Sequence, residues 1–128
     1  MTKEAIKTTN APAAVGPYSQ GIAASGGTRL VFTSGQLPAT PGGDLVSDDI
    51  AEAARRCLEN VRAVLEAGGA RMADVVKVTI FLTDMADFAA VNAVYETFFD
   101  APAPARSCIA VAALPKGARI EIEAVAVR

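Results

Sequence analysis

Residues 74–83 read DVVKVTIFLT, and this segment decides the fold. Its apolar side chains recur at every second position, which is the pattern of a β-strand with one buried face. The face expected to point into the core carries Val76, Val78, Ile80 and Leu82. The other face mixes polar and apolar side chains. The segment is therefore predicted to be a strand.

A helix is expected before this strand. Its apolar positions follow the 3.6-residue rhythm of one buried stripe. The stripe comprises Ile50, Ala54, Cys57, Leu58, Val61, Val64 and Leu65. Asp49 and Glu52 have the spacing of an N-terminal cap, and Gly68-Gly69 is typical of a helix end. The opposite, charged face is typical of a solvated surface.

A second helix is expected after the strand, where Asp84 is placed to cap the first turn. Its inward positions are Phe88, Val91, Val94, Tyr95 and Phe98. We interpret this aromatic stripe as core packing and not as a cofactor site.

Further strands are predicted at 21–24, 29–34, 106–113 and 119–127, the first two as a hairpin joined by residues 25–28. The strands on either side of the second helix should run parallel through a right-handed crossover. Two helices in one layer would then cover one face of a mixed sheet, leaving the Val- and Ile-rich opposite face open in a monomer. This predicts an α+β fold with a single domain over residues 1–128.

The residue counts exclude several kinds of chemistry. The 128-residue chain has no histidine and two cysteines. Triads that use histidine, HExxH zinc sites and histidine-ligated haem are therefore excluded, and a Cys₄ metal cluster is too. No metal site is expected. Cys57 and Cys108 lack CxxC spacing, so reduced thiols in a cytoplasmic protein are expected.

Charge and hydrophobicity bear on partners. The formal net charge is -2, which gives no basic field for a nucleic acid. Hydrophobic residues make up 52% and charged residues 20% of the chain, so part of the surface is expected to contact another subunit. No apolar run approaches the roughly 20 residues that span a bilayer, and no signal-peptide pattern opens the sequence. We expect a homo-oligomer without a membrane or nucleic-acid partner.

Two short segments combine polar groups with a restricted backbone. Residues 16–21 read GPYSQG, and they form either a simple turn with Tyr18 half-buried or one wall of a binding site. Residues 33–36 read TSGQ and end a predicted strand. There Ser34, directly before Gly35, suits either a local cap or a contact to a carboxylate.

Charged residues at two further strands are candidates for chemistry. Arg106 follows a proline-rich loop and offers a fork that matches a carboxylate, with a surface salt bridge as the alternative. Cys108 shares its strand face and is more typical of a packing residue than of a nucleophile. Glu121 and Glu123 lie about 7 Å apart on one strand face. They suit general acid–base chemistry or, alternatively, the polar face of an edge strand.

Strand direction limits how these residues can cooperate. The last strand should run opposite to the strand of Arg106, and Arg106 and Glu121 both lie near the start of their strands. The two side chains should therefore fall at opposite ends of one sheet. Ser34, at the end of a strand antiparallel to the last one, can lie near Glu121. Any site that uses both Arg106 and Glu121 is expected to span two subunits.

The sequence resembles the RidA/YjgF family of reactive-intermediate deaminases over nearly its full length. The matching stretches are 11–21 (APAAVGPYSQG), 33–36 (TSGQ), 60–61 (NV), 91–99 (VNAVYETFF), 104–108 (PARSC), 114–117 (LPKG) and 120–124 (IEIEA). The resemblance implies a chorismate-mutase-like fold with a six-stranded mixed sheet. It also implies a homotrimer with clefts between subunits, in agreement with the open sheet face.

The same resemblance implies an activity: hydrolysis of reactive 2-enamine and 2-imine acids, such as 2-aminoacrylate, to 2-keto acids and ammonia without a cofactor. By its motifs, Arg106 would hold the substrate carboxylate and Glu121 would position or activate the attacking water. Tyr18, Ser34, Gly35 and Asn92 would line the cleft, and the backbone of Cys108 would contact the substrate. The resemblance therefore implies a 2-iminobutanoate/2-iminopropanoate deaminase.

Two other functions stay open. A module that binds small carboxylates or 2-keto acids without turnover would use the same clefts. An RNA-cleaving translation inhibitor is sometimes associated with this family, but the acidic balance and the lack of histidine argue against it.

Overall fold

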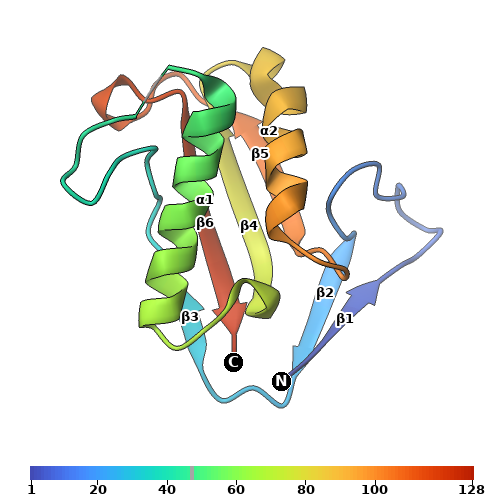
Figure 1. The fold of residues 1–128 in the computed structure, drawn as a ribbon. Coiled ribbons are helices and arrows are strands. Elements are labelled where there is room, and N and C mark those ends of the chain that lie inside the picture. The colour runs from blue at the N-terminus through green and yellow to red at the C-terminus, as the bar shows by residue number, and fades with distance from the viewer. Residues whose placement is uncertain (47) are drawn as a thin grey trace.

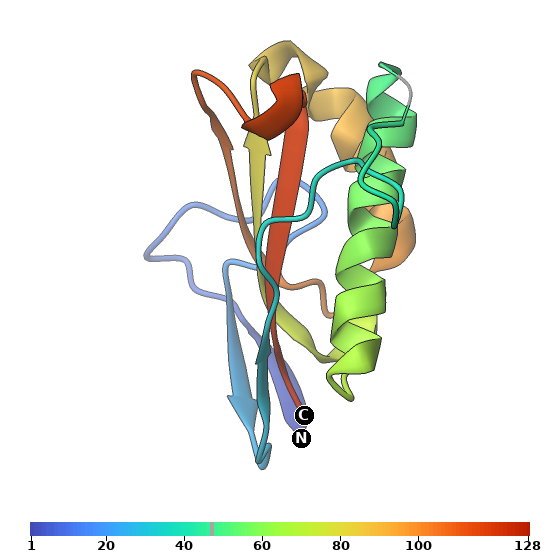
Figure 2. The ribbon, with the colours of Figure 1, turned by 90° about the vertical axis from the view of Figure 1, so that its left-hand side faces the viewer.

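The computed structural model describes residues 1–46 and 48–128. Four strands form a mixed sheet in the order β3-β6-β4-β5, and two helices lie against one of its faces (Figures 1 and 2). The helices and strands are β1 (Thr2–Ile6), β2 (Gly21–Ser25), β3 (Leu30–Phe32), α1 (Ile50–Ala67), β4 (Val75–Leu82), α2 (Phe88–Tyr95), β5 (Ala105–Ala110) and β6 (Ile120–Val127). Short 3₁₀ turns cover Met72–Asp74, Met85–Asp87, Glu96–Phe98 and Pro115–Gly117. The α+β class and the single helix layer are as predicted.

The strand directions also agree with the prediction. β4 pairs in parallel with β5 and antiparallel with β6, so β6 runs opposite to β5 with β4 between them. The helix-facing side chains of these strands, with those of α1 and α2, form the core. On β4 a bulge between Val75 and Lys77 turns Val75 into the core and leaves Val76 half-buried, which corrects the assignment of Val76 to the buried face.

The predicted hairpin of residues 21–24 and 29–34 is wrong. β2 pairs instead with β1, a strand that the sequence did not indicate because Thr2, Lys3 and Glu4 are all polar. β3 pairs with β6. The amides of Thr28 and Arg29 both donate to the carbonyl oxygen of Arg128, at 3.0 and 2.8 Å, which directs the chain away from β2 and onto β6.

The six strands do not form one sheet, which corrects the expected six-stranded sheet. β1 and β2 form a separate two-stranded sheet. An isolated bridge between Ser19 and Ala105 and a 3.1 Å hydrogen bond from Lys3 Nζ to the carbonyl oxygen of Val75 connect the N-terminal part to the larger sheet. Pro104, directly before β5, has no amide hydrogen to donate, so β5 does not extend the ladder toward its N-terminal side.

The first helix lies close to its predicted limits, whereas α2 is shorter than predicted. Its predicted first turn is the 3₁₀ turn Met85–Asp87, and Phe98, which was expected on its inward face, lies half-buried in the 3₁₀ turn Glu96–Phe98. α1 ends at Ala67, with Gly68 as its C-cap, and Val64 lies at the margin of the stripe and is 37% exposed. The buried residues of the helix are Ala53, Ala54, Cys57, Leu58, Val61 and Leu65. The Asp84 carboxylate accepts a hydrogen bond from the amide of Ala86 at 2.9 Å and so caps the turn that leads into α2. None of the helices in the described ranges is long and apolar enough to span a membrane.

The sheet face without helices is open in the single chain, as predicted, and carries exposed apolar side chains beside polar ones. Leu30, Phe32 and Ile109 on this face are 62%, 66% and 44% exposed. Register places Leu30 opposite Val127 and Phe32 opposite Val125. An exposed apolar surface of this kind is typical of an interface.

Candidate active site

Arg106 lies at the start of β5, under α2. Register places it opposite Val78, so its side chain leaves the sheet on the helix-covered face. Its Nη1 donates a 2.7 Å hydrogen bond to Oδ1 of Asn92. Its Cζ lies 4.9 Å from the ring centroid of Tyr95, 5.4 Å from that of Phe88 and 5.5 Å from that of Tyr18. One hydrogen bond and three aromatic rings therefore surround the guanidinium.

Arg106 is not part of a surface salt bridge, so that alternative is wrong. The ion pairs of the described residues involve Arg56, Arg71, Arg119 and Arg128. Arg106 is half-buried and has no carboxylate partner in residues 1–46 and 48–128. A half-buried guanidinium without a counterion is suited to bind an anionic ligand.

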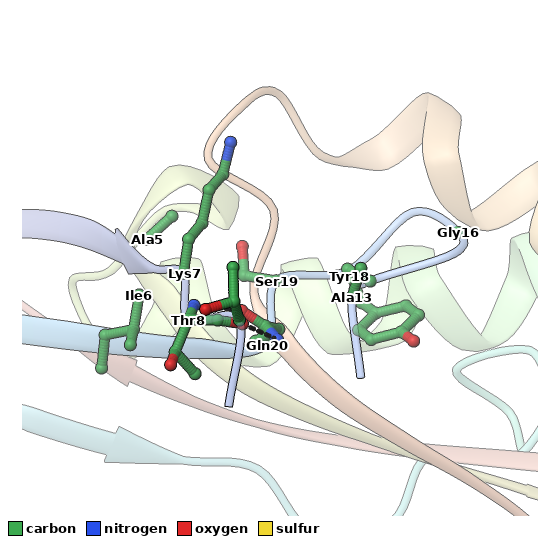
Figure 3. Close-up of a pocket in the computed structure, with 11 residues that line it drawn as sticks. Ala5, Ile6, Lys7, Thr8, Ala13, Gly16, Tyr18, Ser19 and Gln20 are labelled. Atoms are coloured by element: carbon green, nitrogen blue, oxygen red, sulfur yellow. Dashed lines mark hydrogen bonds between the residues drawn. The ribbon is translucent and has the colours of Figure 1, made fainter. Parts of the chain in front are cut away.

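Tyr18 reaches Arg106 from the N-terminal loop. The loop is tied together by the Gln20 carboxamide, which accepts from the amide of Thr8 at 2.8 Å and donates to the carbonyl oxygens of Thr8, Ala11 and Pro12. A cavity of about 500 Å³ lies inside this loop (Figure 3). Arg106 does not line the cavity, although Gly16 and Tyr18 do. The cavity therefore adjoins the Arg106 cluster without containing its charge.

Cys108 follows Arg106 on the same strand face, as predicted. It pairs with Ile80 in the register and is half-buried. Burial raises the pKa of the Cys108 thiol, and the nearby charge of Arg106 only partly opposes this effect. The side chain is therefore a protonated thiol at neutral pH, which is a poor nucleophile.

Glu121 lies in a second cluster, on β6. β6 is an interior strand of the four-stranded sheet, so the edge-strand alternative is wrong. The Glu121 side chain packs against Gly35: a Cβ atom on Gly35 would lie 1.9 Å from Glu121 Oε1. Gln36 exchanges two backbone hydrogen bonds with Ile122, at 2.7 and 3.1 Å. These bonds hold residues 34–36 beside Glu121. Ser34 was expected to lie near Glu121, and the residue in direct contact with Glu121 is its neighbour Gly35.

Arg106 and Glu121 do not meet within one chain. Arg106 lies opposite Val78 and Glu121 opposite Phe81, a separation of three residues, or roughly 10 Å, along β4. The two residues also project from opposite faces of the sheet, because Val78 is buried under the helices and Phe81 is not. The two side chains are apart along the strands, as predicted, but Arg106 pairs with the middle of β4 and not with its end. The separation by face keeps the two side chains apart.

The candidate residues thus form two clusters. The Arg106 cluster includes Asn92, Tyr18, Gly16 and Cys108, and the Glu121 cluster includes Ser34, Gly35 and Glu123. The aromatic pair Phe88 and Tyr95 was expected to serve the core alone. Their spacing from Asn92, four residues before and three after, was the available signal, because such positions share one face of a helix. Within residues 1–46 and 48–128, no three His, Cys, Asp or Glu side chains are arranged to hold a metal ion.

Known proteins match nearly the whole chain. The family model described as "Endoribonuclease L-PSP" matches residues 8–128. The 2-iminobutanoate/2-iminopropanoate deaminase of Salmonella typhimurium is 52% identical over 126 residues, with 96% of each chain covered. The crystal structure of the Escherichia coli YjgF gene product aligns with a TM-score of 0.74 at 51% identity, covering 98% of each chain. That of Escherichia coli TdcF with bound serine aligns with a TM-score of 0.74 at 48% identity over 98% of each chain. The chain belongs to the Endoribonuclease L-PSP family, the family of YjgF that its motifs resemble.

Proposed function

We propose that this protein hydrolyses reactive 2-imino acids to 2-keto acids and ammonia. The reaction is R–C(=NH)–COO⁻ + H₂O → R–CO–COO⁻ + NH₃, in which a C–O bond forms and the C–N bond breaks. The activity is that of the Salmonella relative at 52% identity. The observation that carries the proposal is the half-buried guanidinium of Arg106, which has no carboxylate partner in the described chain and is ready for the substrate carboxylate.

Arg106 supplies orientation in this reaction. The Asn92 hydrogen bond occupies Nη1 and leaves the other guanidinium nitrogens to grip both oxygens of a carboxylate. An imine carbon is already electrophilic, so correct placement of substrate and water provides much of the rate acceleration. Tyr18 closes this side of the cleft, and the backbone of Cys108 contacts the substrate.

Glu121 supplies the proton transfer. Its carboxylate positions the attacking water, takes one of its protons and passes that proton to the imine nitrogen. The hydroxyl proton of the tetrahedral adduct then moves to the amino group, and ammonia leaves as the C–N bond breaks and the C=O bond forms. Ser34, Gly35 and Glu123 border this group. No histidine is required, which suits a chain that has none.

The two groups come together between subunits. Because Arg106 and Glu121 leave opposite faces of the sheet, one copy provides Arg106 and its neighbour provides Glu121. The open face with Leu30, Phe32 and Ile109 supplies the apolar contact area. A homotrimer of chorismate-mutase-like protomers, with three clefts between subunits, accommodates this arrangement.

The activity test couples the purified protein to a threonine or serine dehydratase and follows loss of the imine. Arg106→Ala is expected to reduce turnover about a hundredfold, because two charge-assisted hydrogen bonds are lost. Glu121→Gln should reduce it by about 10² to 10⁴ with the oligomer intact. An Arg106→Ala variant as fast as the wild type would refute the carboxylate assignment. Binding of 2-keto acids without turnover by the wild type would instead favour a binding module.

Mixed oligomers test the shared cleft. Arg106→Ala and Glu121→Gln chains, co-expressed in equal amounts, should restore about one quarter of wild-type activity, since a random quarter of the clefts contains both intact groups. Each variant alone is the control. Mixed oligomers no more active than the separate variants would place both groups in one chain and overturn the arrangement.

Ribonuclease activity is tested with the same variants. The net charge of -2 and the lack of histidine argue against an RNA site. RNA cleavage that persists in the Arg106→Ala, Glu121→Gln double variant would come from another site or from a contaminant.

A further inference from the structure

We infer that one face of α2 fixes the direction of the Arg106 guanidinium, and that the Tyr95 ring is the positioning residue of this face. The inference rests on the proposed function, in that Arg106 binds the substrate carboxylate. It goes further by assigning a role to a core residue that does not touch the substrate.

Three residues of α2 contact Arg106, and their spacing explains how. Phe88, Asn92 and Tyr95 occur at positions i, i+4 and i+7 of a single helix. Such positions share one face. The side-chain oxygen Oδ1 of Asn92 accepts from Nη1 at 2.7 Å, and the rings of Phe88 and Tyr95 lie 5.4 and 4.9 Å from Cζ. One rigid helix therefore determines the position of the guanidinium.

Tyr95 has the best-defined position of the rings around Arg106. It is fully buried, whereas Phe88 and Tyr18 are half-buried. Its ring also packs on Phe99, with the centroids 4.7 Å apart. Since core side chains are held in single rotamers by close packing, the Tyr95 ring is a fixed surface against which Arg106 lies.

Aromatic rings hold the cation without neutralising it. A carboxylate partner would compete with the carboxylate of the substrate, whereas a ring face attracts a cation within about 6 Å and leaves its N–H groups free at the edge. Burial raises the pKa of Tyr95, with the charge of Arg106 opposing, so the phenol remains neutral. The charge of Arg106 therefore stays available to the ligand.

The hydroxyl of Tyr95 takes no part in this role. Tyr95 Oη is buried and makes no hydrogen bond to any of the described residues. Removing a buried polar atom that has no partner does not weaken a protein, so Tyr95→Phe keeps the ring and its function. Tyr95→Leu removes the ring and retains an apolar side chain.

The test measures binding of 2-oxobutanoate by calorimetry and turnover in the dehydratase-coupled assay. Tyr95→Leu is expected to weaken 2-oxobutanoate binding about five- to thirtyfold, the range of a partly desolvated cation–π contact. Tyr95→Phe should stay within about threefold of the wild type. Phe98→Leu is the matched control, because the Phe98 ring lies 5.5 Å from Cζ of Arg62, outside the site. It should reduce stability without changing the affinity.

Two results would overturn the inference: wild-type affinity in a folded Tyr95→Leu variant, or equal losses in Tyr95→Leu and Tyr95→Phe. If Tyr95→Leu does not fold, Phe88→Leu removes a half-buried ring of the same face and should weaken binding by a similar factor. Wild-type affinity of that variant would equally contradict the inference.

A spectroscopic readout separates this inference from the proposed function. In the ligand-free protein, the ring current of Tyr95 should shift the NMR signal of the Arg106 Nε–H group, and Tyr95→Leu should remove that shift while Tyr95→Phe keeps it. The shift is expected even if the protein turns over no imine. A signal that is the same in all three proteins would refute the positioning role, whatever the activity assay shows.

Discussion

Gly35→Ala tests whether the position of the Glu121 carboxylate controls the reaction. A Cβ atom on Gly35 would lie 1.9 Å from Oε1, 2.7 Å from Cδ and 3.0 Å from Cγ of Glu121. Ordinary contact begins at 3.4 Å, so the carboxylate oxygen must move by about 1.5 Å. The displaced atoms belong to the outer part of a flexible side chain, and we expect the fold to survive.

The expected effect is on rate. Misplacement of a catalytic group by about 1 Å costs about 10²-fold, so imine turnover by Gly35→Ala should fall at least about a hundredfold in the dehydratase-coupled assay. The melting temperature should change by only a few degrees, because the strain is relieved by rotating one side chain.

Two controls sharpen this experiment. Gly42→Ala adds the same methyl group where, among the described residues, the nearest atom is Thr40 Oγ1 at 3.7 Å, and it should leave turnover unchanged. If Gly35 acts only through Glu121, the Gly35→Ala, Glu121→Gln double variant should be no slower than Glu121→Gln alone. A Gly35→Ala enzyme with wild-type turnover, beside a slow Glu121→Gln enzyme, would refute the reasoning.

Three further predictions concern other residues. Burial favours a raised pKa at the Asp74 carboxyl, but hydrogen bonds from Arg71 and Arg128 outweigh burial and the pKa is lowered. The stability that the ionised carboxylate provides is present above about pH 4 and is lost as the pH falls through the lowered pKa. The difference in unfolding free energy between the wild type and Asp74→Asn should therefore shrink when denaturation is measured at decreasing pH. A difference that stays constant would contradict this prediction. Cys108→Ser should keep turnover within about threefold of the wild type in the coupled assay, because the protonated thiol is a poor nucleophile. A hundredfold loss of turnover would contradict the assignment of Cys108 as a residue that does not react. Gln20→Glu replaces the side-chain NH₂ group that donates to three carbonyl oxygens with an acceptor, so amide hydrogen exchange in residues 8–16 should become faster. Unchanged exchange would show that Gln20 does not hold this loop in place.

Local periodicity was enough to predict much of the fold. The alternation in residues 74–83 and 119–127 and the stripe of α1 correspond to β4, β6 and the buried face of the first helix. The relative direction of two strands could be predicted where a helix connects them, because such a crossover makes them parallel. The separation of Arg106 from Glu121 followed from these directions.

The sequence was a poorer guide to which strands pair with each other. Thr2–Ile6 has no buried run that marks it as a strand, so β2 was assigned to the wrong partner. The Val75 bulge depends on the register with β6, which a single strand does not encode.

The site was predicted in part. The residues of the two clusters were recognisable from motifs, but the contacts of Phe88 and Tyr95 with Arg106 were not. The periodicity of a helix shows which side chains face inward, but it does not show which residue of a distant strand lies beneath them.

The alternation of β6 has a consequence for how this sequence can vary. Ile120, Ile122, Ala124 and Ala126 fill the core, while Glu121, Glu123, Val125 and Val127 occupy the other face. Deleting or inserting one residue near Ile120 would exchange the two sets, burying both carboxylates under the helices and exposing the isoleucines. Substitutions that keep the alternation preserve both sets, so this strand should accept changes of side chain far more readily than changes of length.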